Sequence, residues 1–163
     1  MDCENTAKAI LKRAKELNLT ITCAESCTGG LISAALTHSA GASAVFERGF
    51  VTYSNQAKMD MLDVSQETLG NVGAVSEEVA QEMADGARQN ASAQLAISVT
   101  GIAGPGGSDF KPEGRVCFGL STNSGPTYTE TVEFGALGRE HVRLETVKHA
   151  LTMTLNKLNS ISD

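Results

Sequence analysis

Ser26 and Lys58 are the two side chains of this sequence whose types and positions could act together chemically. Ser26 stands in the segment AESCTGG (residues 24–30), where an apolar run changes abruptly to small polar residues. A serine hydroxyl is weakly nucleophilic at neutral pH and needs a base, which is usually a histidine. No histidine lies in or beside this segment, but a lysine that loses its charge in a poorly hydrated cleft can serve instead. The pair therefore predicts acyl transfer by a Ser–Lys dyad, with Ser26 as nucleophile and Lys58 as base.

Each of these residues also has an ordinary structural explanation. Ser26 could cap a helix, Lys58 could be a solvated surface lysine, and the segment could be a polar turn between a strand and a helix. Cys27 is a rival nucleophile beside Ser26. Alternation at the end of the strand predicts that the Cys27 side chain points into the core, where a thiol is inert. Spacing alone leaves these alternatives open.

Two glycine-rich loops are expected to hold the substrate, the first at residues 25–30 (ESCTGG) and the second at residues 100–107 (TGIAGPGG), within the longer loop 100–114. Each follows a predicted strand, and ligands collect at the carboxyl ends of strands in open α/β sheets, so both loops should face one cleft. Backbone amides at a helix start attract anions, and the amides of residues 28–30 would form an oxyanion hole. The residues that we expect to contact substrate are Glu25, Thr28, Gly29, Gly30, Tyr53, Asn55, Thr100, Gly101 and Gly104.

The acid that precedes the serine has three possible roles. Glu25 could pair with Lys58, hold a ribose hydroxyl, or cap the helix that follows. Tyr53 and Asn55 precede Lys58 closely and could orient either the ligand or the base. The sequence does not choose among these roles.

Other nucleotide and metal sites fit the sequence poorly. The glycine pattern lacks both the GKS or GKT ending of a P-loop and the G-x-G-x-x-G spacing of a dinucleotide site. A phosphatase or pyrophosphatase would need clustered acids around a divalent metal, whereas Glu25 and Asp109 stand apart in different loops. The histidines, at positions 38, 141 and 149, show no metal-ligand spacing. We therefore expect no metal.

The apolar pattern predicts the elements that must position these side chains. Helices are expected over 3–17, from 31 onward, and over 59–62, 76–90 and 138–158, with strands over 19–24, 45–55, 94–101, 115–122 and 127–134 and a loop over 71–75. Strands alternate with helices early, and a hairpin comes late. This order favours an α/β fold, a three-layer α/β/α sandwich with a mixed, mostly parallel sheet. No repeat or linker interrupts the chain, so we expect one domain over residues 1–163.

Bulk composition narrows the class of partner. Lys and Arg number 13 against 19 Asp and Glu, and this net charge of −6 disfavours non-specific nucleic-acid binding, which depends on cations. The sequence contains no CxxC pair, no basic-then-apolar leader pattern and no apolar run long enough to span a membrane. We therefore expect a cytoplasmic protein with reduced thiols, without cofactor, nucleic-acid or membrane partner.

Four segments in order resemble the CinA C-terminal domain family: AESCTGG (24–30), FERGFVTYSNQAK (46–58), GAVSEEV (73–79) and SVTGIAGPGG (98–107). The resemblance extends from about residue 4 to residue 158, nearly the whole chain. Single-domain members of that family are nicotinamide-nucleotide amidases. The resemblance therefore implies hydrolysis of nicotinamide mononucleotide to nicotinate mononucleotide and ammonia, in pyridine nucleotide salvage and without a cofactor.

The resemblance also implies roles for individual residues. The family's serine in ESCTGG and lysine in YSNxxK map to Ser26 and Lys58, and its small-residue loop maps to residues 100–107 and would help to hold the nucleotide. Arg139, near the start of the last helix, is expected to meet the phosphate. The alternative is a non-catalytic nucleotide-binding or interaction module in which Ser26 and Thr28 only ligate phosphate. We expect a homo-oligomer, with a twofold dimer as the default.

Overall fold

A mixed five-stranded sheet forms the centre of the structure, a computed structural model that describes residues 2–108 and 110–162. Strand β1 pairs in parallel with β2 and β3, and the pairs β3–β4 and β4–β5 are antiparallel, so β4 alone among the five runs against the others. Across the sheet the strands lie in the order β2-β1-β3-β4-β5. Their bounds are β1 (Ile21–Glu25), β2 (Phe46–Val51), β3 (Leu95–Gly101), β4 (Arg115–Thr122) and β5 (Tyr128–Glu133).

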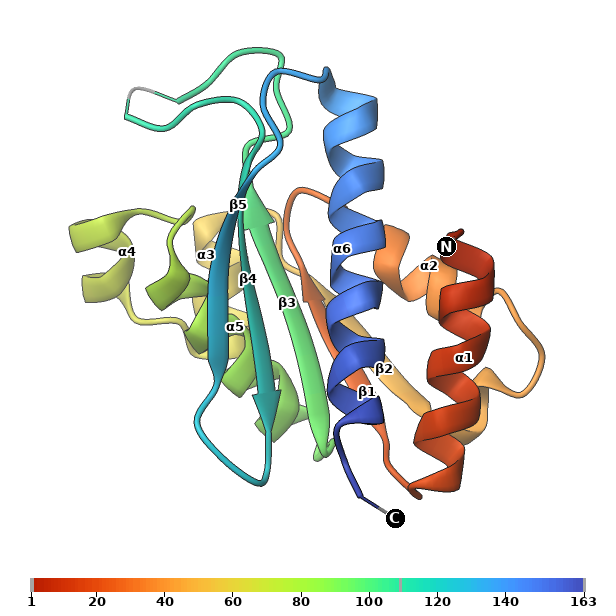
Figure 1. The fold of residues 1–163 in the computed structure, drawn as a ribbon. Helices are drawn as coiled ribbons and strands as arrows, with labels where there is room; N and C mark the ends of the chain where they lie inside the picture. Colours follow the sequence, from red (N-terminus) through yellow and green to blue (C-terminus); the bar gives the residue numbers. More distant parts are fainter. Residues whose placement is uncertain (1, 109, 163) are drawn as a thin grey trace.

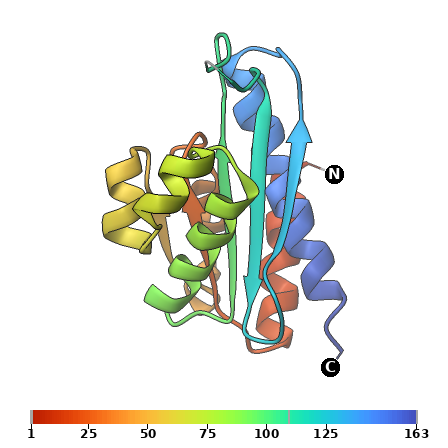
Figure 2. The ribbon, with the colours of Figure 1, turned by 90° about the vertical axis from the view of Figure 1, so that its left-hand side faces the viewer.

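Helices cover both faces of this sheet. One face carries α1 (Cys3–Glu16), α2 (Leu31–Thr37) and α6 (Arg139–Asn159), and the other carries α5 (Glu77–Asn90) with α3 (Asn55–Leu62) and α4 (Gln66–Val72) beside it (Figures 1 and 2). A short 3-10 helix (Ala42–Ala44) precedes β2. The predicted three-layer α/β/α sandwich is confirmed. Within the described part of the chain, none of the helices combines the length and the apolar character that crossing a membrane requires.

The two faces of the sheet bury separate apolar clusters. Successive side chains of a strand point to opposite faces, so Ile21 and Cys23 of β1 join the cluster under α1, α2 and α6, whereas Ala24 joins the cluster under α5. All five residues of β1 are buried because helices lie on both sides. The small side chains Ala24 and Ala96 leave room for α5 to approach the sheet.

Several elements differ from the predicted ones: α3 begins at Asn55 instead of residue 59, and α4 was not predicted. Two of the differences have a clear local cause. The strand β2 ends at Val51 instead of residue 55, because the Ser54 hydroxyl accepts a hydrogen bond from the Ala57 amide (3.0 Å) and starts α3. Lys58 is therefore part of a helix and not of a polar connection. The predicted loop over 71–75 is shorter, because Ser65 caps α4 and the helix continues to Val72.

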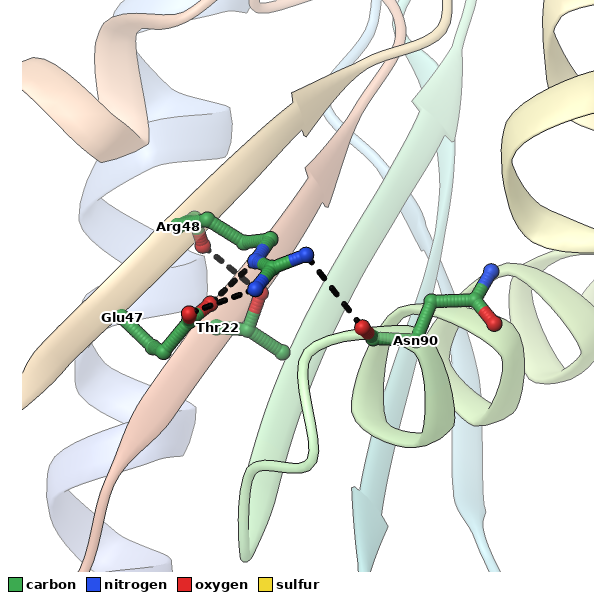
Figure 3. A network of polar contacts seen from close by, with 4 residues as sticks. All are labelled: Thr22, Glu47, Arg48 and Asn90. Carbon is green, nitrogen blue, oxygen red and sulfur yellow. Dashed lines mark hydrogen bonds and ion pairs between the residues drawn. The ribbon is translucent and has the colours of Figure 1, made fainter.

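Edge strand β2 is fastened to its neighbours by a small polar network at an irregular point (Figure 3). The register between β1 and β2 shifts at Thr22, and the Thr22 hydroxyl donates to the backbone carbonyl of Arg48 (2.7 Å). The Arg48 guanidinium contacts the Glu47 carboxylate and reaches the Asn90 carbonyl at the end of α5 (3.4 Å). This network helps to fix the strand that leads into Tyr53 and α3.

Candidate active site

Ser26 lies directly after β1, in the turn that leads to α2 at the carboxyl edge of the parallel strands. Its amide donates to the Val99 carbonyl of neighbouring β3 (3.1 Å), so the sheet hydrogen bonding continues up to Ser26. The Ser26 side chain is largely buried, with 8% of the residue exposed. The strand thus delivers the serine to the edge of the sheet on a well-fixed backbone.

Lys58 reaches this serine from α3. Its Nζ atom lies 2.9 Å from Ser26 Oγ, 2.8 Å from the Thr52 carbonyl oxygen and 3.3 Å from the Tyr53 carbonyl oxygen, and only 1% of the residue is exposed. Burial lowers the pKa of Lys58 to about 8. A neutral amine has two N–H groups, which the two carbonyls can accept, and its lone pair is then left for the serine hydroxyl.

Close packing between α3 and α5 sets the position of Lys58. Gly86 of α5 faces the end of α3, where an added Cβ would lie 1.9 Å from the Leu62 carbonyl oxygen. Any side chain at position 86 would push α3 away from α5. The helix that carries the lysine can therefore approach only because residue 86 is a glycine.

Glu25, expected to contact substrate, instead caps α2 and has no exposed surface. Its carboxylate does not pair with Lys58. Besides a weaker bond from the Cys23 thiol (3.7 Å), it accepts bonds from five nitrogen and oxygen donors. They are Thr28 Oγ1 (2.5 Å), Gly30 N (3.1 Å), Ile32 N (3.0 Å), Ser33 N (2.8 Å) and Ser33 Oγ (2.8 Å). Of the three roles left open by the sequence, the structure shows the capping role. Thr28 is also fully buried, so its hydroxyl is not presented to a ligand.

The oxyanion hole expected at residues 28–30 must also be corrected. The Gly29 amide donates to the Ser26 carbonyl (3.1 Å) and the Gly30 amide to Glu25, so neither is free. Both glycines have positive φ, +60° and +106°, which lets the chain turn this tightly into α2. The amides of Cys27 and Thr28 have no hydrogen-bond partner on another described residue. These two amides are the remaining candidates for stabilising an oxyanion.

The rival nucleophile Cys27 is in an unfavourable environment for reaction. Its side chain belongs to the apolar cluster under α6, as alternation predicts, and 5% of the residue is exposed. Burial raises the pKa of the Cys27 thiol to about 11, so the thiol is protonated at neutral pH. Ser26 is therefore the better candidate nucleophile.

The two glycine-rich loops meet at one cleft of about 320 Å³, near the lower limit of usual ligand pockets. The first loop lines it only through residues 26–27 and the second through residues 100–106, so the expectation that Glu25 and residues 28–30 face the cleft is wrong. Larger hollows of about 430, 490 and 530 Å³ lie elsewhere, but none of them is lined by Ser26 or Lys58. Residues 74–75, which were not predicted to belong to the site, also line the cleft that contains Ser26 and Lys58. The predicted residues that line the cleft are Ser26, Tyr53, Asn55, Lys58, Thr100, Gly101, Gly104 and Arg139.

Arg139 crosses the mouth of this cleft. Its Nη2 donates to the Tyr53 hydroxyl (2.7 Å) and its Nη1 to the Gly104 carbonyl (2.8 Å), so it links the connection between β2 and α3, the second loop and α6. The Thr100 hydroxyl is already engaged, because it donates to the Ala74 carbonyl (2.9 Å). Arg139 and Lys58 are the two cations that line the described part of the cleft.

Metal chemistry finds no support among the described residues, which contain no group of three or more histidine, cysteine, aspartate or glutamate side chains arranged for a metal. Asp109, which the sequence analysis weighed as a ligand, lies outside the described residues. Cys3, Cys23, Cys27 and Cys117 are all unpaired.

Comparisons with known proteins agree with the fold. Residues 3–158 match the family described as CinA C-terminal domain. The nicotinamide-nucleotide amidohydrolase PncC of Enterobacter agglomerans is 52% identical over 138 residues, which are 84% of this chain and 84% of that protein. A putative competence-damage inducible protein of Caldicellulosiruptor saccharolyticus is 47% identical over 135 residues, 82% of this chain but only 32% of that longer protein.

A solved structure gives the same result. The crystal structure of the competence/damage inducible protein CihA from Agrobacterium tumefaciens has a TM-score of 0.93 and 48% sequence identity, and it covers 98% of this chain and 97% of that chain. By sequence and by structure alike, this chain belongs to the CinA C-terminal domain family.

Proposed function

We propose that this chain hydrolyses the carboxamide of nicotinamide mononucleotide, giving nicotinate mononucleotide and ammonia, through a dyad of Ser26 and Lys58. The observation that carries the proposal is the buried contact of 2.9 Å between Lys58 Nζ and Ser26 Oγ, beside a ligand-sized cleft. The lowered pKa of Lys58 supports its use as a base. The substrate class is supported by the 52% identical relative named nicotinamide-nucleotide amidohydrolase.

The reaction begins when neutral Lys58 takes the hydroxyl proton of Ser26 and Oγ attacks the carboxamide carbon. The oxyanion that forms accepts hydrogen bonds from the free amides of Cys27 and Thr28. Protonated Lys58 then gives its proton to the leaving nitrogen, and ammonia departs. A water molecule, deprotonated by Lys58, attacks the acyl-enzyme, so that nicotinate mononucleotide is released and Ser26 regains its proton. The pyridinium charge of the substrate withdraws electrons and favours both attacks.

Arg139 is the residue that we assign to the phosphate of the substrate. It is the exposed cation at the mouth of the cleft, whereas Lys58 is buried and engaged with Ser26. Arginine pairs well with phosphate through two parallel N–H donors, and the hydrogen bonds to Tyr53 and Gly104 hold its side chain over the opening. Anchoring the phosphate there would place the carboxamide near Ser26.

Ammonia release from nicotinamide mononucleotide, with chromatography of the nucleotide product, tests the proposal. Ser26→Ala should lower kcat by about 10³–10⁶-fold while the protein remains folded, because members of an acyl-transfer unit fail together. The control is Ser124→Ala, in an exposed turn of the β4–β5 hairpin. Near-normal turnover by Ser26→Ala would exclude the dyad. Binding of the nucleotide by folded wild-type protein without ammonia release would favour the non-catalytic module instead.

We propose that residues 1–163 act as one catalytic domain, in the cytoplasm and without nucleic-acid or membrane partners, and that the chain forms a homo-oligomer, with a dimer as the default. Four unpaired cysteines support a reducing compartment. Light scattering of the purified protein measures the oligomeric state.

A further inference from the structure

Arg143, to which the sequence analysis gave no role, grips the turn that follows Ser26. It lies one helical turn after Arg139 on α6 and is half-buried. Its Nε donates to the Cys27 carbonyl (3.1 Å) and its Nη2 to the Thr28 carbonyl (3.1 Å). These are the first two carbonyls after the serine.

The contacts of Arg143 complement those of Glu25. The carboxylate of Glu25 takes up the Gly30 amide and the amides at the start of α2, while the guanidinium takes up carbonyls on the same turn. Glu25 therefore holds the N–H groups of this turn, and Arg143 holds its C=O groups. The Cys27 and Thr28 amides are left without a partner on another described residue.

The grip on the carbonyls determines where the free amides point. In a trans peptide, the C=O of one residue and the N–H of the next point in opposite directions. Fixing the Cys27 carbonyl on Arg143 therefore fixes the direction of the Thr28 amide. Fixing the Thr28 carbonyl likewise fixes the Gly29 amide, which donates to the Ser26 carbonyl (3.1 Å) and in this way sets the direction of the Cys27 amide. A cation on the Cys27 carbonyl also polarises the peptide and strengthens its N–H as a donor.

We propose that Arg143 is a positioning residue for catalysis: it holds the peptide groups after Ser26 so that the Cys27 and Thr28 amides meet the oxyanion. The inference rests on the proposed amidase function and extends it to a residue that need not touch substrate. Arg143 thus acts on the transition state and not on binding of the nucleotide. Small displacements of catalytic groups can cost about 10²-fold in rate.

The test compares Arg143→Gln and Arg143→Lys with wild type, with Lys148→Gln as a control that removes an exposed cation from the same helix. Three quantities are measured for each: kcat and KM for nicotinamide mononucleotide, the affinity for the product, and the affinity for the substrate analogue that carries an aldehyde in place of the carboxamide. Ser26 Oγ adds to the aldehyde carbon, its proton goes to Lys58, and the resulting oxyanion probes the two amides.

Arg143→Gln should lower kcat and the affinity for the aldehyde analogue by about 10–100-fold, while KM and product affinity change by less than about threefold. Arg143→Lys, which keeps the charge and one donor direction, should lose less, and Lys148→Gln should match wild type. Should Arg143→Gln fail to fold, the same split in Arg143→Lys carries the test.

Three outcomes overturn the inference. The first is a wild-type kcat in both Arg143 variants. The second is a raised KM and a weaker product affinity with kcat unchanged, which would make Arg143 a phosphate ligand. The third is an equal loss of affinity for the product and for the aldehyde analogue. If wild-type protein itself releases no ammonia, the proposed function fails. With an active wild type, a normal Arg143→Gln rejects only the role of Arg143.

Discussion

The pH dependence of the reaction follows from the burial of Lys58. Burial lowers the pKa of this lysine from 10.5 to about 8, and only the neutral amine can accept the Ser26 proton. At pH 7 about a tenth of the lysine is neutral, and at pH 9 about nine-tenths. We therefore expect kcat/KM to rise about tenfold between pH 7 and pH 9 and then to level off. A lysine with its ordinary pKa would give about a hundredfold rise over the same interval and no plateau.

Product formation should be measured by chromatography of stopped reactions, because coupled ammonia assays carry the pH dependence of their own enzymes. Over this interval the substrate phosphate is already doubly ionised, since its second pKa is near 6, so the rise reports on the enzyme. Ser26→Ala measured at each pH supplies the background hydrolysis. A flat profile, or one that still climbs steeply beyond pH 10, would refute the assignment of Lys58 as a base with a lowered pKa.

The same lysine predicts a change in stability that needs no substrate. Below pH 8 the amine is protonated in both the folded and the unfolded chain, so burying its charge lowers the free energy of unfolding by the full amount. Between pH 8 and 10.5 the folded protein has released the proton while the unfolded chain still holds it, so the free energy of unfolding rises with pH, by about 3 kcal/mol in total. The difference in urea stability between wild type and Lys58→Met should therefore shift in favour of wild type from pH 7.5 to pH 10. A difference that does not change with pH would contradict the lowered pKa.

Three further substitutions test other parts of the site. Glu25→Gln should lower the free energy of unfolding by about 2–4 kcal/mol in urea, because the carboxamide brings donors against donors of the α2 cap. Gly86→Ala should cost about 1–3 kcal/mol and lower kcat by displacing α3, whereas Gly125→Ala, with open space around it, should do neither. Arg139→Gln should raise KM about 10–100-fold with kcat within about threefold of wild type, and an unchanged KM would remove Arg139 from the phosphate site.

Much of the architecture was accessible from the sequence because it depends on local patterns. Alternation of apolar strands and amphipathic helices is a property of neighbouring residues, and it predicted the three layers correctly. The Ser26–Lys58 contact could also be anticipated, because both residues follow strands that end at the same edge of the sheet. Strand and helix ends were less accurate, since the Ser54 cap competes with continued strand pairing.

The hydrogen-bond partners of the polar groups in the turn after Ser26 could not be predicted. The same sequence, a glutamate followed by a serine and two glycines, is compatible with a carboxylate that faces a ligand and with one that folds back onto the amides of α2. The choice depends on the positive φ of Gly29 and Gly30, which bends the chain over the carboxylate. For Arg143 a weak signal existed, because its four-residue spacing from Arg139 places both side chains on one face of a helix.

In the proposed mechanism, substrate binding and chemistry would be divided between two arginines of α6. Arg139, at the exposed start of the helix, faces the mouth of the cleft, and Arg143, one turn further, faces the carbonyls behind the nucleophile. One helix thus connects the end of the cleft that would hold phosphate with the turn that would stabilise the oxyanion. A rigid connection of this kind would couple the two ends by geometry alone, since a shift of α6 moves both guanidinium groups together. Such a shift would weaken substrate anchoring and oxyanion stabilisation at once, whereas the single substitutions separate them into an effect on KM and an effect on kcat.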